Sequence, residues 1–308
     1  MSLLCRAGLL RTASSGVCRR FLATGTRTVV EGAAETVKPR SISGTVSQSW
    51  GRALVAGGCL AGIGSLCFYG LGMSSEAGAI DRAKFWPRVV KERVQKTYTY
   101  FTGGLAVTAA AAAATVRSGL IARFSRMSPI VFLLVGLGGS LGSYMLCVSV
   151  PYENTLMKHS AWLMFSGVWG MFLAPAVMMG GALVARAAIY TAGTVAGLTF
   201  TAACAPSDKF LNWAGPLSLG LGAVCVASIG SMFLGPMSSL GMGMYSFTLY
   251  GGLIVFGGFM LYDTQKIIKA AEMEPHFDPV NASLGIYMDA INIFIRILTI
   301  LSSSSRKK

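Results

Sequence analysis

Long apolar runs recur through most of this chain and limit what it can fold into. From Ala53 onward, eight runs approach the roughly 20 apolar residues that a helix needs to cross a bilayer. They cover approximately residues 53 to 73, 98 to 116, 128 to 149, 160 to 180, 183 to 204, 216 to 234, 243 to 262 and 284 to 301. Hydrophobic residues make up 53% of the 308 residues and charged residues 12%. The sequence therefore predicts an all-α polytopic membrane helix bundle of about eight transmembrane segments, one of them doubtful.

The first 30 residues differ from the rest of the chain. They carry Arg6, Arg11, Arg19, Arg20 and Arg27, several Ser and Thr, and no acid before residue 31. An Arg-rich, acid-free start with leucines spaced for one helical face is typical of a mitochondrial transit peptide. We therefore predict a transit peptide at 1–30, a flexible Ser-rich lead-in at 31–50 and a bundle at 51–308 in the mitochondrial inner membrane.

The chain is strongly basic, with 26 Lys and Arg against 12 Asp and Glu. Most of the cations flank apolar runs, and no nucleic-acid-binding motif accompanies them, so we expect the bilayer and not a nucleic acid as the partner. Ten cations would fall on each side if every run crossed, so the positive-inside rule predicts no orientation. Residues 74–97 alternate apolar and charged side chains and predict an interfacial amphipathic helix, or else a surface that binds a partner protein.

The sequence predicts neither a zinc site nor an enzyme active site. The two His residues, His159 and His276, are far apart, and the seven Cys form no CxxC pair. A zinc site or disulfide framework is therefore not expected. The absence of an HExxH motif, a phosphate-binding loop and a His-supported nucleophile argues against an enzyme, and we expect no cofactor.

Two aspartates stand out because acids are so rare in the apolar runs. Asp263 ends the seventh run, and Asp289 lies about one and a half turns into the eighth, after a predicted connection of about twenty residues. A carboxylate at the centre of a membrane helix costs roughly 2.5 to 3.5 kcal/mol, which makes it a functional candidate. A helical hairpin of this shape could bring both carboxylates to similar depth. Such a pair tends to share a proton.

Asp289 also begins a polar stripe on one helical face, continued by Asn292, Arg296 and Thr299. The stripe could line an ion path, with Asn292 as a neutral ligand and Arg296 holding the aspartate pair closed. Carboxylate oxygens could bind Ca²⁺ transiently. Two structural alternatives stay open: Asp263 may cap the helix that follows it, and Asp289 with Arg296 may mark an amphipathic helix on the surface.

The two aspartate motifs, LYDTQKII at 261–268 and YMDAINIFIRIL at 287–298, resemble those of the transmembrane BAX inhibitor motif family. The stretches FYGLGMSSEAGAI, LVARAAIYTAG, CAPSDKFLNWAGPLSLGLG and GSMFLGP and the terminal RKK are similar to its mitochondrial branch. The resemblance covers roughly residues 50 to 308. It implies a seven-helix core, here preceded by one N-terminal span, and a Ca²⁺ pore gated by an aspartate pair, which by motif is Asp263 and Asp289. It also implies a role in restraining apoptosis.

One departure from the family concerns an Arg on an early core helix that latches the aspartate pair. No early apolar run of this chain carries a central Arg: Arg117 lies at the end of a run, and Arg186 belongs to another helix. The mitochondrial branch implies Ca²⁺/H⁺ handling and cristae organisation. We therefore expect an inner-membrane cation transporter, either a Ca²⁺/H⁺ antiporter or a Ca²⁺ leak. The alternative is a non-transporting scaffold that organises cristae and holds inner-membrane protein partners.

Overall fold

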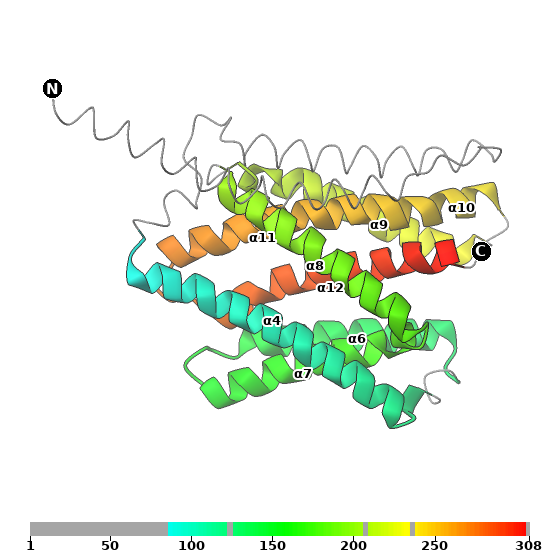
Figure 1. Ribbon diagram of the computed structural model, residues 1–308, viewed down its shortest axis with the longest axis horizontal. Coiled ribbons are helices and arrows are strands. Elements are labelled where there is room, and N and C mark those ends of the chain that lie inside the picture. The colour runs from blue at the N-terminus through cyan, green and yellow to red at the C-terminus, as the bar shows by residue number, and fades with distance from the viewer. Residues whose placement is uncertain (1–85, 122–125, 206–208, 235–237, 306–308) are drawn as a thin grey trace. The chain divides into compact units, whose positions relative to one another are not determined.

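The structure is a computed structural model that describes residues 86–121, 126–205, 209–234 and 238–305 (Figure 1). The regular elements in these ranges are all helical, as predicted. Within these ranges, seven helices are long and apolar enough to cross a membrane. They are Arg88–Arg117, Ile130–Ser149, Thr155–Val177, Gly181–Cys204, Leu211–Ser231, Ser239–Met273 and Pro279–Ser303. Each overlaps one predicted span, whereas the span predicted at 53–73, the transit peptide and the lead-in lie outside the described residues.

The helices follow one another along the chain with short connections. In order they are α4 (Arg88–Arg117), α6 (Pro129–Ser149), α7 (Thr155–Val177), α8 (Gly181–Cys204), η1 (Leu211–Trp213), α9 (Ala214–Phe233), α10 (Ser239–Ser246), η2 (Phe247–Gly251), α11 (Gly252–Met273) and α12 (Pro279–Ser305). They pack as two compact units. The first unit contains Ala196–Gln265, and the second contains Trp86–Val195 together with the residues from 266 onward.

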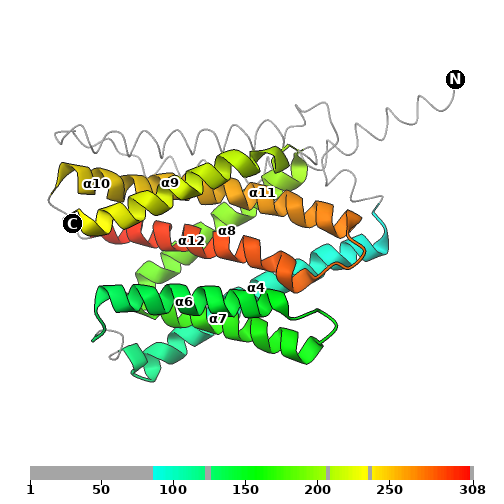
Figure 2. The same ribbon diagram turned by 180° about the vertical axis from the view of Figure 1, so that it is seen from behind.

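Helices α4 and α7 form the tightest contact of the second unit, and small residues make it possible. A Cβ atom at Gly170 of α7 would lie 2.5 Å from the carbonyl oxygen of Thr108 and 2.6 Å from the Cβ of Ala111 on α4. Small residues let membrane helices approach this closely, where lipid offers no hydrophobic drive for association. Figure 1 shows α4 crossing α7, and Figure 2 shows α6 running beside α7.

Helix α11 is prolonged at its N-terminal side by a π-helical turn. In the first unit, α10 passes through η2, whose five residues Phe247–Gly251 form the π turn, directly into α11. Single π turns inside longer helices are rare and often occur at functional sites. Together the three elements make the candidate span Ser239–Met273, which is 35 residues long.

The end of α11 and the start of α12 differ from the sequence-based boundaries. Helix α11 continues past residue 262 to Met273, and α12 already begins at Pro279. The predicted connection of about twenty residues is therefore wrong, because only residues 274–278 join the two helices. Helix α4 likewise begins at Arg88, so residues 88–97 of the predicted interfacial segment are its first turns.

Candidate functional site

Asp289 lies in the interior of a membrane-spanning helix, as predicted. It occupies α12 ten residues after Pro279, within the candidate span Pro279–Ser303, and only 5% of its surface is exposed. The neighbouring Ala290 and Ile291 are also buried. Burial of this kind disagrees with the alternative that Asp289 marks an exposed amphipathic helix. In a chain with few intramembrane acids, it keeps Asp289 as the leading candidate for an ion-binding carboxylate.

Asp263 lies inside α11, ten residues before Met273, and its side chain is half-buried. The alternative that Asp263 caps the following helix is wrong, because α11 runs through this position without interruption. A cap residue needs non-helical backbone, which Asp263 does not have. The aspartate is therefore an interior residue of a long helix, like Asp289.

The two residues after Asp263 in the LYDTQ motif make hydrogen bonds, and those of Gln265 join α11 to other segments of the first unit. The hydroxyl of Thr264 donates to the carbonyl of Met260 at 2.7 Å. Gln265 is buried; its Oε1 accepts from the backbone N–H of Phe210 at 2.8 Å, and its Nε2 donates to the carbonyl of Ala202 at 3.3 Å. The two contacts of Gln265 satisfy a carbonyl in the last turn of α8 and a backbone N–H of the connection that follows it. The motif therefore combines one carboxylate with the side chain of Gln265, which fixes α11 in the first unit.

Tyr287 holds the other motif, YMDAIN, in the second unit. Its hydroxyl contacts Oγ1 of Thr108 on α4, and that oxygen lies 2.8 Å from the carbonyl oxygen of Gly104 and 3.1 Å from that of Ser166 on α7. Tyr287 can donate to Thr108 while Thr108 donates to one of the two carbonyls. This buried cluster joins α4, α7 and α12 two residues before Asp289.

The polar stripe after Asp289 makes hydrogen bonds within its own helix. Nη1 of Arg296 donates to Oδ1 of Asn292 at 3.1 Å and to its carbonyl at 3.2 Å, and Nδ2 of Asn292 donates to the carbonyl of Met288 at 2.9 Å. The hydroxyl of Thr299 donates to the carbonyl of Ile295. Since Oδ1 of Asn292 faces a guanidinium, a cation could use it only after Arg296 moves away.

The two carboxylates fall in different packing units. Asp263 belongs to the first unit and Asp289 to the second. Their pairing, and the latching role of Arg296, therefore stay predictions. In the described ranges, no group of three or more His, Cys, Asp or Glu could hold a metal ion.

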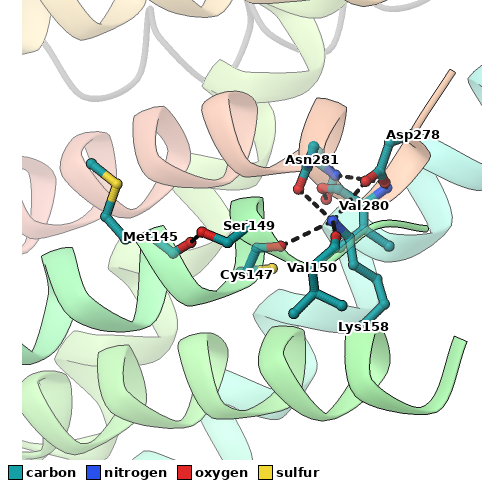
Figure 3. A network of polar contacts seen from close by, with 9 residues as sticks. Met145, Cys147, Ser149, Val150, Lys158, Asp278, Val280 and Asn281 are labelled. Atoms are coloured by element: carbon teal, nitrogen blue, oxygen red, sulfur yellow. Dashed lines mark hydrogen bonds and ion pairs between the residues drawn. The ribbon is translucent and has the colours of Figure 1, made fainter. Parts of the chain in front are cut away.

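Sequence reasoning missed a buried ion pair at the start of α12 (Figure 3). The side chain of Lys158 on α7 is 0% exposed, and its Nζ lies 2.6 Å from Oδ2 of Asp278. The same ammonium donates to the carbonyls of Cys147 at 2.9 Å and Val150 at 2.8 Å, and to Oδ1 of Asn281 at 2.8 Å. Four oxygens therefore surround one buried cation.

Asp278 has a second role at this position, because it caps α12. Its Oδ1 accepts from the backbone N–H groups of Val280 at 2.9 Å and Asn281 at 3.1 Å. An Asp followed by Pro279 at the first helical position is a recognisable N-terminal signature that could have placed the start of α12. Lys158 gave no such signal, because hydropathy placed it just before the run at 160–180 although α7 begins at Thr155.

A second cation contacts the other side of the connection 274–278. Arg93 on α4 donates to the carbonyls of Ala271 at 3.0 Å, Glu274 at 2.7 Å and Pro275 at 3.1 Å. Its guanidinium also lies 5.6 Å from the ring centre of Phe277. Cations near a helix C-terminus interact favourably with its unpaired carbonyls. The end of α11 is thus held by α4 and the start of α12 by α7.

Known proteins resemble this chain over most of its length. Residues 90–306 match the family described as "Inhibitor of apoptosis-promoting Bax1". The growth hormone-inducible transmembrane protein of Rattus norvegicus is 47% identical over 264 residues, which cover 84% of this chain and 76% of that protein. Bax inhibitor 1 of Arabidopsis thaliana is 32% identical over 177 residues, 55% of this chain and 68% of the relative. Human Bax inhibitor 1 is 27% identical over 186 residues, 58% and 76% of the two chains.

Proposed function

Because this chain belongs to the Bax inhibitor family, we propose that it is a cation transporter of the mitochondrial inner membrane that exchanges Ca²⁺ for H⁺ through Asp263 and Asp289. The N-terminal transit-peptide pattern supports the mitochondrial location. Restraint of apoptosis and support of cristae organisation are the cellular roles that we propose to follow from this transport.

One observation carries the proposal: two successive membrane-spanning segments each hold a carboxylate in the helix interior. Asp263 lies ten residues before the end of α11, and Asp289 lies ten residues after the start of α12. At 1.5 Å per residue, both positions are roughly 15 Å from the short connection measured along their helices. A pair of carboxylates at these two positions could bind a divalent cation when ionised and release it on protonation.

Proton coupling follows from the energetics of Ca²⁺ movement. Moving one charge across a membrane potential is worth about 2.3 kcal/mol per 100 mV, so a divalent cation that enters an energised matrix gains about 4.6 kcal/mol per 100 mV. Extrusion of Ca²⁺ against this potential needs an energy source. Protons that enter through the same carboxylates would supply it, and without such coupling the pair would serve as a Ca²⁺ leak.

The test is Ca²⁺ flux in proteoliposomes that contain the purified mature protein, with an imposed pH gradient. Asp263→Asn and Asp289→Asn keep the size of each side chain but remove the titratable charge. We expect wild-type flux to follow the pH gradient and each substitution to reduce this dependence at least tenfold. Glu272→Gln is a matched control, because Glu272 is an exposed acid in the last turn of α11, and it should transport like wild type.

The opposite result would identify a different function. Wild-type protein that moves no more Ca²⁺ than empty vesicles would contradict the transport proposal and favour the scaffold. In that case the two Asn variants should retain cristae organisation in cells. Loss of the other basic side chains between Arg82 and Lys96, with Arg93 kept because it contacts the end of α11, should instead impair it, since that segment would hold the partner proteins.

A further inference from the structure

The connection between the two aspartate-bearing helices is held at both ends by buried or half-buried cations. Arg93 binds the carbonyls at the end of α11, and Lys158 binds Asp278 at the start of α12. All of these residues belong to the second unit. A five-residue connection at a membrane surface is usually among the more mobile parts of a protein. Two contacts that restrain it therefore suggest that the position of the helices it joins is important.

Groups of negative and positive character alternate around Lys158: the carbonyls at the end of α6, the ammonium, the carboxylate of Asp278 and the N–H groups at the start of α12. The C-terminal end of α6 presents the carbonyls of Cys147 and Val150 to the ammonium. The Asp278 carboxylate lies on the other side of the ammonium and faces the backbone N–H groups of α12. Helix C-termini favour cations and helix N-termini favour anions, so each charge stabilises its neighbour. Displacing any one of them would leave a buried charge without its counter-charge.

Apolar contacts reinforce the same region. Val90 of α4, Ala271 of α11 and Phe277 of the connection form a buried cluster, against which Trp86 and Val94 pack. The first turns of α4 thus contact the α11 end of the connection through Arg93 and Val90. Lys158 contacts its α12 end.

We propose that Lys158 and Asp278 are positioning residues, which fix the first turn of α12 and thereby the place of Asp289, eleven residues further along the same helix. The assignment rests on the proposed function. Removing the ion pair would let the start of α12 shift and carry Asp289 with it, since a helix transmits displacement along its axis. The Ca²⁺-binding geometry, and not only the amount of folded protein, would then change.

Hydrogen exchange measured by mass spectrometry on the full-length mature protein in lipid nanodiscs tests the anchor without reference to transport. Lys158→Met keeps the long apolar stem but removes the charge. The double variant Lys158→Met/Asp278→Asn also removes the carboxylate charge while Asn retains the helix cap, so it leaves no stranded charge. We expect amides in residues 280–286 to exchange at least tenfold faster in both variants, with α9 unchanged as an internal control.

Ca²⁺ flux of the double variant tests the positioning role. A displaced Asp289 should raise the half-saturating Ca²⁺ concentration at least threefold, whereas a simple loss of folded protein would lower only the maximal rate. Unchanged exchange at 280–286 would overturn the anchor even if wild type transports Ca²⁺. Faster exchange with an unchanged half-saturating concentration would overturn the positioning role. Faster exchange in a protein whose wild type carries no Ca²⁺ would support the anchor and contradict the proposed function alone.

Discussion

At residue 170, the absence of a side chain decides how closely two helices approach. The backbone of α4 occupies the space that a Cβ at Gly170 would need, whereas Gly167 on the same helix has no atom within 4 Å of such a Cβ. The two glycines therefore carry opposite structural requirements although hydropathy treats them alike. The close approach of α4 requires glycine at position 170, whereas position 167 has room for a larger side chain.

Gly170→Ala should destabilise the protein, because neither the carbonyl of Thr108 nor the neighbouring backbone can move aside without separating α4 from α7. Overpacking of this kind typically costs about 1 to 3 kcal/mol. Thermal unfolding in detergent is the measurement, and Gly167→Ala is the matched control. Equal melting temperatures for the two variants would show that α4 and α7 do not meet at Gly170.

Single residues also show what hydropathy can and cannot predict about the candidate site. Asp289 was found because it interrupts an apolar run, and Asn292 and Arg296 followed from helical spacing. Lys158 and Asp278 were missed because charges at the ends of membrane helices usually lie in water. Only the packing of three helix ends around Lys158 shows that this ammonium is buried.

The length of α11 shows the same limit at the scale of a helix. Hydropathy ends the span at residue 262, because TQKIIKAAEM contains charged residues. The structure extends the helix to Met273, and the residues concerned include the good helix formers Lys, Ala, Glu and Met. Hydropathy measures the part of a helix that suits lipid, so it underestimates a helix that continues beyond it. Hydropathy therefore places Asp263 at a helix end.

Arg93→Met should loosen the end of α11, because it removes one hydrogen bond to a carbonyl of its last turn and two to carbonyls of the residues just after it. We expect hydrogen exchange in residues 270–277 to accelerate several-fold. Arg88→Met is the control on the same helix: Arg88 is 93% exposed and pairs with Glu92, and surface pairs contribute little. If Arg93→Met exchanged like Arg88→Met, the cation would have no role in holding α11.

For the whole molecule, the order of the spans determines which connections share a side of the membrane. Four candidate spans separate the connection at 150–154 from that at 274–278, so both should lie on one side. The contacts of Lys158 with Val150 and with Asp278 agree with this inference, since they join the two connections directly. One further span, Pro279–Ser303, places the end of α12 on the opposite side.

Sided cysteine labelling should reveal this arrangement. In a variant whose native cysteines are replaced by serine, Glu153→Cys and His276→Cys should react to the same extent with a membrane-impermeant maleimide. Ser303→Cys should react to the complementary extent, whatever mixture of orientations the vesicles contain. Labelling after detergent permeabilisation gives the total for each position. Different extents for positions 153 and 276 would contradict the predicted order of spans.

The π turn at Phe247–Gly251 gives the span Ser239–Met273 one place where a residue can be lost without turning the rest of the helix. A π turn closes one residue later than an α turn, so deleting one residue there could convert it into ordinary α-helix. A deletion between Gly252 and Tyr262 would instead rotate Asp263 and Gln265 by roughly 100° relative to the preceding turns. One-residue deletions in related genes should therefore be tolerated at this turn and be rejected in the helix that follows it.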